Sequence, residues 1–148
     1  MGLEEYRKKR DFNKTTEPMG EIVENEERYF VVHRHQASHL HWDLRLEMDG
    51  VLKSWAVPKE PPLVPGVRRL AVQVEDHPLD YMDFQGTIPP GEYGAGTVEI
   101  WDKGTFELQK LEAGKIEFSV RGNKLQGGYI LIHTGGKNWL FLKRKSTA

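Results

Sequence analysis

The chain begins with a polar stretch and changes at Tyr29 to short apolar runs separated by turn signals. Residues 1–27 show little apolar periodicity, so we expect a loosely attached polar arm with a short helical turn near residues 4–9. After residue 29, β-branched and aromatic runs are typical of strands. The pattern predicts strands at 29–35, 40–48, 51–57, 69–76, 97–102, 105–109, 116–121, 128–134 and 138–144. No helical periodicity of useful length follows residue 30, which indicates an all-β domain.

Turn residues predict how these strands are connected. Asp49-Gly50 is typical of a two-residue hairpin turn, which would pair Leu44 with Trp55 and Asp43 with Ala56. Further turns are expected at Lys103-Gly104, Gly122-Asn123 and Gly135-Gly136.

Two segments contain prolines, which cannot donate hydrogen bonds within a sheet, so residues 58–66 and 86–96 are predicted as long loops. Closure into a barrel removes exposed strand edges. We therefore predict a compact antiparallel β-barrel formed by residues 28–148, with residues 1–27 as an N-terminal arm.

The predicted strand 40–48 has one apolar face and one face rich in chemistry. Successive side chains of a strand point to opposite faces. The apolar face carries Trp42, Leu44, Leu46 and Met48, and the other face carries His41, Asp43, Arg45 and Glu47. In strand 69–76, Arg69, Ala71, Gln73 and Glu75 share one face, and Leu70, Val72 and Val74 share the other.

Composition narrows the classes of function. The chain has 148 residues, 38% hydrophobic and 29% charged, as expected for one globular domain. It has no cysteine, so a metal would need His, Asp or Glu ligands. No apolar run is long enough to span a membrane, and the first ten residues lack a signal-peptide core, so we expect a cytoplasmic protein. The net charge of −1 is low for a domain that binds nucleic acid by charge alone.

Histidines are concentrated near the charged face. His41 and Asp43 point the same way on one strand, and His35 precedes them on the neighbouring strand. Two imidazoles and one carboxylate suit Mn, Fe or Zn and leave positions open for substrate. A hydrogen-bonded polar cluster without metal is the alternative. His33 is either a ligand, a substrate contact or a satisfied polar neighbour, and His39 is expected at the surface.

A second group of residues could bind phosphate. Arg45 lies one pleat beyond Asp43, and a guanidinium can bind phosphate through two hydrogen bonds. His77 and Tyr81 follow the end of strand 69–76 and could contact the same group, with His77 as a candidate general acid. Lys59 and Arg69 flank the proline-rich loop and could add charge, although the spacing alone favours an ordinary surface position for each.

Long ungapped motifs resemble the 3′-phosphoesterase domain of DNA ligase D. They are YFVVHRHQASHLHWDLRLEMDGVLKSWAVPKE at 29–60 and RLAVQVEDHPLDYMDFQGTIPPGEYGAG at 69–96. The arm, with YRKKRDFNKTTEP, and the end, with KLQGGYILIH and NWLFLKRK, resemble the same family.

This resemblance implies a β-barrel with an active-site groove and a Mn²⁺-dependent enzyme, with Zn²⁺ or Co²⁺ as possible substitutes. Such an enzyme removes a terminal ribonucleoside from a primer–template and then the remaining 3′-phosphate. The resemblance places metal ligands at His35, His41 and Asp43 and phosphate contacts at Arg45, His77 and Tyr81. It implies supporting roles for Lys59, Arg69, Glu75, Asp11 and Glu17.

Two positions depart from the family pattern. His33 stands where glutamine is expected, which could change substrate preference, and Trp42 stands on the apolar face where tyrosine is expected. The polymerase and ligase domains that accompany this domain in bacteria are not in the sequence, so we expect a stand-alone version whose ligase or polymerase partner would be a separate protein.

Two other classes of function remain open from the sequence. A non-haem iron oxygenase would use His41 and Asp43 with a distant histidine such as His133. A non-catalytic barrel could bind single strands through aromatic side chains such as Trp55, Trp101 and Trp139.

Overall fold

Strands make up most of the described chain, which comprises residues 3–18 and 28–145 of the computed structural model. The elements are α1 (Glu4–Lys8), β1 (Tyr29–Gln36), β2 (Leu40–Met48), β3 (Val51–Val57), β4 (Arg68–His77), the 3₁₀ turn η1 (Leu79–Asp83), β5 (Gly86–Ile88), β6 (Gly96–Glu112), β7 (Lys115–Arg121), β8 (Gln126–Gly135) and β9 (Asn138–Lys143). No helix among these residues is long and apolar enough to cross a membrane. The expected boundary at residue 27 lies outside the described residues.

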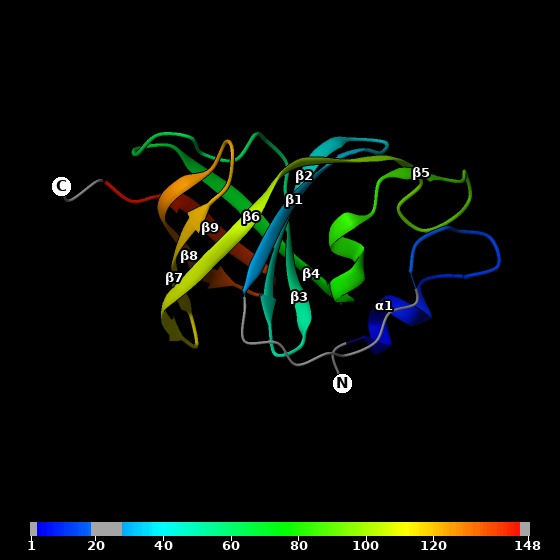
Figure 1. Cartoon of the computed structure of the whole chain (residues 1–148), viewed down its shortest axis with the longest axis horizontal. Coiled ribbons are helices and arrows are strands. Elements are labelled where there is room, and N and C mark those ends of the chain that lie inside the picture. The colour runs from blue at the N-terminus through cyan, green and yellow to red at the C-terminus, as the bar shows by residue number, and fades with distance from the viewer. Residues whose placement is uncertain (1–2, 19–27, 146–148) are drawn as a thin grey trace.

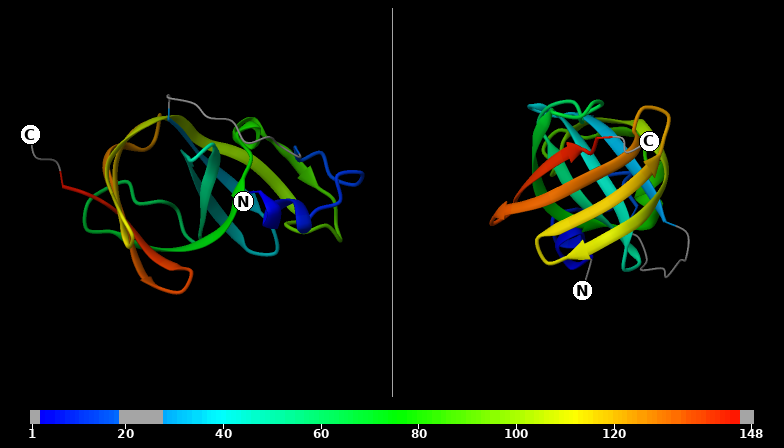
Figure 2. Two further views of the ribbon diagram at one scale, coloured as in Figure 1. Left: turned by 90° about the horizontal axis from the view of Figure 1, so that it is seen from below. Right: turned by 90° about the vertical axis from the view of Figure 1, so that its left-hand side faces the viewer.

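Eight of the strands close into an antiparallel barrel. The order is β1-β2-β3-β4-β9-β8-β7-β6, and β1 also pairs with β6, which completes the ring. The short strand β5 pairs with β6 outside this ring. Figure 2 shows the strands curving around a common centre, and Figure 1 shows α1, η1 and β5 gathered at one end of the molecule, away from the C-terminus. The predicted all-β antiparallel barrel is confirmed.

The Asp49-Gly50 hairpin sets the register of β2 and β3 as predicted. Leu44 pairs with Trp55, and Asp43 pairs with Ala56. Asp49 and Gly50 have φ values of 56° and 78°. A two-residue turn with positive φ at both positions matches the right-handed twist of the flanking strands, which explains why this dipeptide fixes the register.

One predicted turn is wrong. Lys103-Gly104 lies inside β6, which runs without interruption from Gly96 to Glu112. A Cβ on Gly104 would lie 2.0 Å from the carbonyl oxygen of Arg121 on β7, so glycine here allows two strands to approach closely. The predicted loop 86–96 also differs, because its first three residues form β5.

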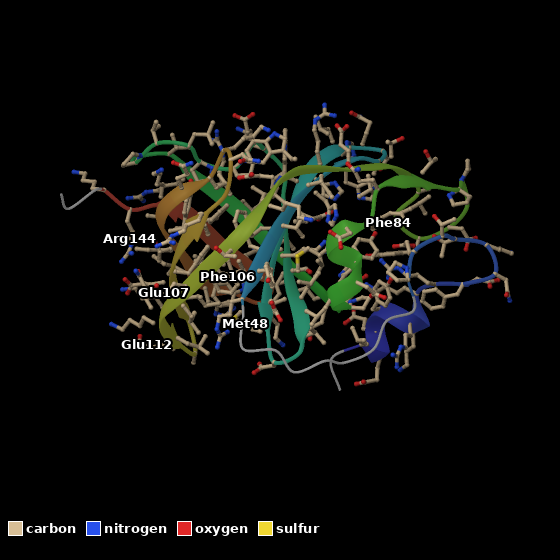
Figure 3. The ribbon with its side chains drawn as sticks, in the orientation of Figure 1. Met48, Phe84, Phe106, Glu107, Glu112 and Arg144 are labelled. Carbon is tan, nitrogen blue, oxygen red and sulfur yellow. The ribbon has the colours of Figure 1, made fainter. Side chains whose placement is uncertain are left out.

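Two hydrophobic clusters lie on opposite faces of the same sheet. The larger fills the barrel and includes Trp55, Phe118, Tyr129 and Phe141, with Trp42 packed against it as expected. The smaller cluster lies outside the barrel, where the arm, η1 and β5 cover the sheet, and it contains Tyr6, Leu52, Tyr81, Phe84, Ile88 and Val98. In Figure 3, Phe84 lies beside η1, whereas Met48 and Phe106 lie in the barrel half.

The described part of the arm is packed firmly, so the expectation of loose attachment is wrong. Leu3 and Tyr6 are fully buried. The Tyr6 hydroxyl donates a hydrogen bond to the carbonyl of Pro18, which holds the two ends of this segment together. The predicted helical turn is α1, and its contacts with β4 place arm residues over the outer face of the sheet.

Candidate metal centre and phosphate cleft

The charged face predicted for β2 lies on the outside of the barrel, under the arm. In the β1–β2 ladder, His35 pairs with His41 and His33 pairs with Asp43. Paired residues of adjacent strands point to the same side of a sheet, so these side chains form one continuous patch. The patch opens into a cleft of about 300 Å³. The side chains that line the cleft include Arg10, His35, His41, Asp43, Arg45, Glu75, His77, Tyr81 and Tyr93.

His35, His41 and Asp43 converge at one end of this cleft. Ligand atoms from all three lie within 4.8 Å of one another. The Asp43 Oδ2 atom is 3.2 Å from His41 Nε2 and 3.7 Å from His35 Nδ1. Three donors that face a common point, beside an accessible cleft, are the arrangement expected of a catalytic metal centre with open coordination positions.

Each imidazole is oriented by a backbone carbonyl on its other nitrogen. His35 Nε2 lies 2.7 Å from the carbonyl oxygen of Gly94, and His41 Nδ1 lies 3.2 Å from that of His39. If these nitrogens carry the protons, His35 Nδ1 and His41 Nε2 present lone pairs toward Asp43. Metal-binding histidines usually donate their second N–H in this way, so the donor set fits a divalent cation.

The charge state of Asp43 also fits a metal ligand. Burial alone would raise the pKa of Asp43, but the positive charge of Arg45 holds it well below its ordinary value, and the imidazoles of His35 and His41 lower it further in any tautomer that donates to the carboxylate. The Arg45 Nη2 atom is 3.4 Å from Asp43 Oδ2. The carboxylate is therefore ionised at neutral pH, with a guanidinium directly beside it.

An irregularity in β4 turns His77 toward the cleft. Ser54 pairs with Val74, but Leu52 pairs with His77, so β4 has one extra residue between these pairs. Bulges of this kind re-aim side chains near active sites. The extra residue explains why Ala71 points into the barrel core while His77, of the same sequence parity, faces the cleft. Leu70, expected on an apolar face, is instead 45% exposed.

His77 lies between two guanidinium groups. Its Nδ1 atom is 3.0 Å from the carbonyl oxygen of Glu75 and 3.2 Å from Arg45 Nη1, and its Nε2 atom is 3.3 Å from Arg10 Nη2. A neutral ring that donates from Nδ1 to Glu75 and accepts at Nε2 from Arg10 satisfies two of these contacts, and Arg45 Nη1, itself a donor, then lies beside Nδ1 without a hydrogen bond to it. Burial, followed by the charges of Arg45 and Arg10, lowers the pKa of His77 well below its ordinary value.

His33 lies behind Arg45 and does not line the cleft. It is fully buried, with Nδ1 accepting from Arg45 Nε at 3.1 Å and Nε2 lying 3.1 Å from the carbonyl oxygen of Phe84. Burial, and then the charge of Arg45, lowers the pKa of His33 to about 3, so the ring is neutral. Both nitrogens are bonded within the protein, which makes His33 a support for Arg45.

Tyr81 and Glu17 form a buried pair at the edge of the cleft. The Tyr81 hydroxyl donates to Glu17 Oε2 at 2.8 Å. Burial raises the pKa of Tyr81 well above its ordinary value, so the hydroxyl keeps its proton. The Tyr81 ring also lies 5.0 Å from the Arg45 guanidinium. The ring of Tyr81 therefore contacts the Arg45 guanidinium, and its hydroxyl is hydrogen-bonded to Glu17 of the arm.

Arg10 is the main cleft residue that the sequence did not reveal. Its side chain is 4% exposed and forms ion pairs with Glu17 at 2.9 Å and Glu75 at 3.0 Å. It also stacks 4.0 Å from the centre of the Tyr6 ring. In the sequence Arg10 ends a run of four basic residues that looks like solvated surface. Only its acidic partners, Glu17 in the arm and Glu75 on β4, distinguish it from its neighbours.

Several candidate residues do not reach the cleft. Lys59 is exposed, and Arg69 donates to the carbonyl oxygen of Glu60. Asp11 is exposed and accepts a hydrogen bond from the amide of Asn13. His133 is exposed, with its Nε2 atom 2.7 Å from the carbonyl oxygen of Gly136, so it is not brought to the triad. Trp55 and Trp139 are buried in the barrel core, which removes two of the three aromatic rings considered for single-strand binding.

Known proteins are similar to this sequence over nearly its whole length. Residues 33–133 match the family described as DNA Ligase D 3′-phosphoesterase domain. The chain is 50% identical over 155 residues to the multifunctional non-homologous end joining protein LigD of Pseudomonas aeruginosa. It is 45% identical over 150 residues to the protein of that name from Mycobacterium bovis, and 45% identical over 157 residues to that from Mycolicibacterium smegmatis.

These matches cover 97% of this chain but only 18% of the Pseudomonas protein and 20% of the two others. The chain therefore spans about a fifth of the length of these relatives. It belongs to the DNA ligase D 3′-phosphoesterase domain family.

Proposed function

We propose that this chain is a metal-dependent phosphoesterase that processes the 3′ ends of nucleic acid strands. The observation that carries this proposal is the convergence of His35, His41 and Asp43 beside the guanidinium of Arg45 in an accessible cleft. A cation site next to a fixed positive charge is suited to a phosphate group, which needs several of its oxygens neutralised during reaction. Family membership supports the same chemistry.

The triad would hold one divalent cation through His35 Nδ1, His41 Nε2 and Asp43 Oδ2. Two imidazoles and a carboxylate suit Mn²⁺, and the same set accommodates Zn²⁺ or Co²⁺. When bound, the cation would supply Lewis acidity that polarises a phosphoryl oxygen. The protein contributes the orientation of its ligands, because the carbonyl groups of Gly94 and His39 hold the two rings.

The cationic wall of the cleft would bind the phosphoryl oxygens. Arg45 is held from behind by His33, which leaves its Nη groups directed toward Asp43 and His77. Arg45 would stabilise negative charge as it develops on the phosphoryl group. His77 would contact the same group. A phosphate in the cleft would add negative charge near His77 and raise its pKa, which a role as general acid requires.

Two successive hydrolyses would restore a 3′-hydroxyl. In the first, water attacks phosphorus and the bond to the 5′-oxygen of a terminal ribonucleoside breaks, which releases the nucleoside and leaves a 3′-phosphate. In the second, the bond to the 3′-oxygen breaks and inorganic phosphate leaves. The relatives are named for non-homologous end joining, so we propose primer–template ends as substrates, a ligase or polymerase as functional partner, and a cytoplasmic location.

One incubation tests the proposal. The chain is mixed with Mn²⁺ and a duplex primer–template that ends in a single 3′-ribonucleotide, with and without chelator, and products are resolved by length and end group. We expect a primer shortened by one nucleoside with a 3′-phosphate, followed by a 3′-hydroxyl, only when metal is present.

Variants of the site make the test specific. Asp43→Asn should abolish product formation, and Arg45→Ala should slow it by about 100- to 1,000-fold, the usual cost of losing a group that stabilises the transition state. Lys110→Ala is the matched control, because this exposed lysine on β6 does not line the cleft and has no proposed role in the site. Full activity of the Asp43 variant, or equal activity in chelator, would remove the proposed function.

A further inference from the structure

An aromatic ring stands exposed at the cleft. Tyr93, in the loop between β5 and β6, is 47% exposed and lines the cleft. Among the large hydrophobic side chains of the described residues that are exposed, it is the one aromatic, the others being aliphatic. Tyr93 belongs to neither hydrophobic cluster, so packing of the core does not explain why this ring lies at the cleft.

The loop fixes this ring relative to the metal triad. The next residue, Gly94, accepts a hydrogen bond from His35 Nε2 at 2.7 Å through its carbonyl oxygen. Within the loop, the amide of Glu92 donates to Pro89, and the amide of Ala95 donates to Glu92. Tyr93 is therefore directly next in sequence to the residue whose carbonyl contacts a proposed metal ligand. The hydrogen bonds within the loop restrain the backbone that carries the Tyr93 ring.

Two cations of the arm flank the ring. The ammonium group of Lys9 lies 4.6 Å from the ring centre and 3.3 Å from the Tyr93 hydroxyl. The guanidinium of Arg10 lies 5.4 Å from the ring centre. Sites for single-stranded nucleic acid combine an aromatic surface, on which a base stacks, with positive charge that follows the backbone. Arg10 is already engaged by Glu17 and Glu75. The side chain of Lys9 is 31% exposed, and its ammonium group also pairs with Glu5 and Glu75. Tyr93 and Lys9 therefore place both features beside the proposed phosphate position.

We propose that the Tyr93 ring is a stacking surface for a nucleobase next to the scissile phosphate. The inference rests on the proposed function and adds a substrate contact to it. Every nucleobase has a flat π-face, so such a contact tolerates any base and requires only that a base is present. Tyr93 would position the 3′ terminus and would take no part in bond breaking.

Steady-state kinetics on two substrates test the inference. One primer–template carries normal bases at its last two 3′ positions, and the other carries the same sugars and phosphates without those two bases. Removing one aromatic stacking partner weakens binding by about 5- to 150-fold. For Tyr93→Leu we expect KM to rise within that range on the normal substrate, with kcat nearly retained and no change in KM on the substrate without bases. Tyr93→Phe keeps the ring and should restore the KM.

A control and a binding measurement separate this inference from the proposed function. Trp101 is the control, because the ammonium group of Lys124 lies 5.3 Å from the centre of its ring but Trp101 does not line the cleft. The KM of Trp101→Leu should therefore equal that of the wild type. Fluorescence anisotropy with the same two oligonucleotides in chelator reports stacking without hydrolysis. If wild-type protein hydrolyses neither substrate, the proposed function fails, and anisotropy still decides the role of Tyr93. An equal loss on both substrates, or no loss on either, would overturn the stacking role.

Discussion

The guanidinium of Arg10, in the N-terminal arm, lies 3.0 Å from the carboxylate of Glu75 on β4. The same guanidinium pairs with Glu17 at 2.9 Å, so one buried cation offsets two buried carboxylates. An isolated helix as short as the five residues of α1 is not stable in water. The arm therefore depends on this cluster and on Tyr6 for its position, and one wall of the cleft depends on the arm.

Replacing Arg10 should destabilise the fold as well as the site. In Arg10→Ala, Glu17 and Glu75 would lose their shared partner while they remain buried. Breaking a buried ion pair by removing one member typically costs about 3–5 kcal/mol. We expect a loss of that order in urea denaturation, with release of the arm detected as faster proteolysis near α1. Lys8→Ala, at an exposed position two residues away, should change the free energy of unfolding by less than about 0.5 kcal/mol.

Gly94 should influence metal affinity although it is not a ligand. It has a φ of 77°, and a Cβ there would lie 3.6 Å from His35 Cε1. Gly94→Ala strains the backbone and disturbs the carbonyl that orients His35. Losing an outer contact of this kind typically lowers metal affinity about 10- to 100-fold, which calorimetry with Mn²⁺ would measure. Gly91→Ala is a close control, because Gly91 has a φ of 90° but nothing within 4 Å of its added Cβ. Equal losses in the two variants would assign the effect to strain alone.

The convergence of His35, His41 and Asp43 could be predicted because it follows from strand periodicity, while metal binding by these residues stays a proposal. His41 and Asp43 share a face of β2, and a short connection to β1 brings His35 opposite His41. The Asp49-Gly50 turn then fixes β3 beside them. These features depend on short segments of sequence. The alternation of side chains and one turn were therefore sufficient to predict that His35, His41 and Asp43 lie on the charged face of the sheet.

Features that depend on distant contacts were not predictable in this way. The extra residue in β4 reverses the face of His77 relative to Ala71, and no local pattern marks where a strand will bulge. Arg10 looks like its exposed neighbours until Glu17 and Glu75 are placed around it. Gly104 resembles a turn residue in sequence, but it permits close packing of β6 against β7. In each case the deciding contacts include a strand that local sequence does not place beside the residue.

The stability of the protein should fall as pH decreases through the range in which free histidine titrates. Burial, Arg45 and Arg10 lower the pKa of His77 well below 6.5, so the unfolded chain binds a proton that the folded protein does not. Stability from this group is complete above about pH 6.5 and decreases below it, by at most about 1.4 kcal/mol per pH unit. Urea denaturation in chelator between pH 7.5 and 5 measures the slope. His33, whose pKa is lowered to about 3, adds to the same slope, so His77→Gln should reduce it without removing it. An unchanged slope in this variant would show that other groups cause the dependence.

His33 should act through Arg45 and not through the metal or the substrate. Its Nδ1 atom accepts from Arg45 Nε, and its Nε2 atom lies at hydrogen-bond distance from the carbonyl oxygen of Phe84. Glutamine can supply one acceptor and one donor at this position, whereas leucine supplies neither. A buried donor without a partner costs about 1–3 kcal/mol, which corresponds to about 5- to 150-fold if the cost appears in the transition state.

We therefore expect His33→Leu to lower kcat by about that factor and His33→Gln to keep kcat close to wild type, with Mn²⁺ affinity unchanged in both. Single-turnover kinetics and calorimetry measure the two quantities. Weaker Mn²⁺ binding in His33→Leu would instead indicate that His33 supports the triad, since it pairs with Asp43 across the β1–β2 ladder. A glutamine variant as slow as the leucine variant would show that the imidazole ring itself, and not its two hydrogen bonds, is what holds Arg45 in place.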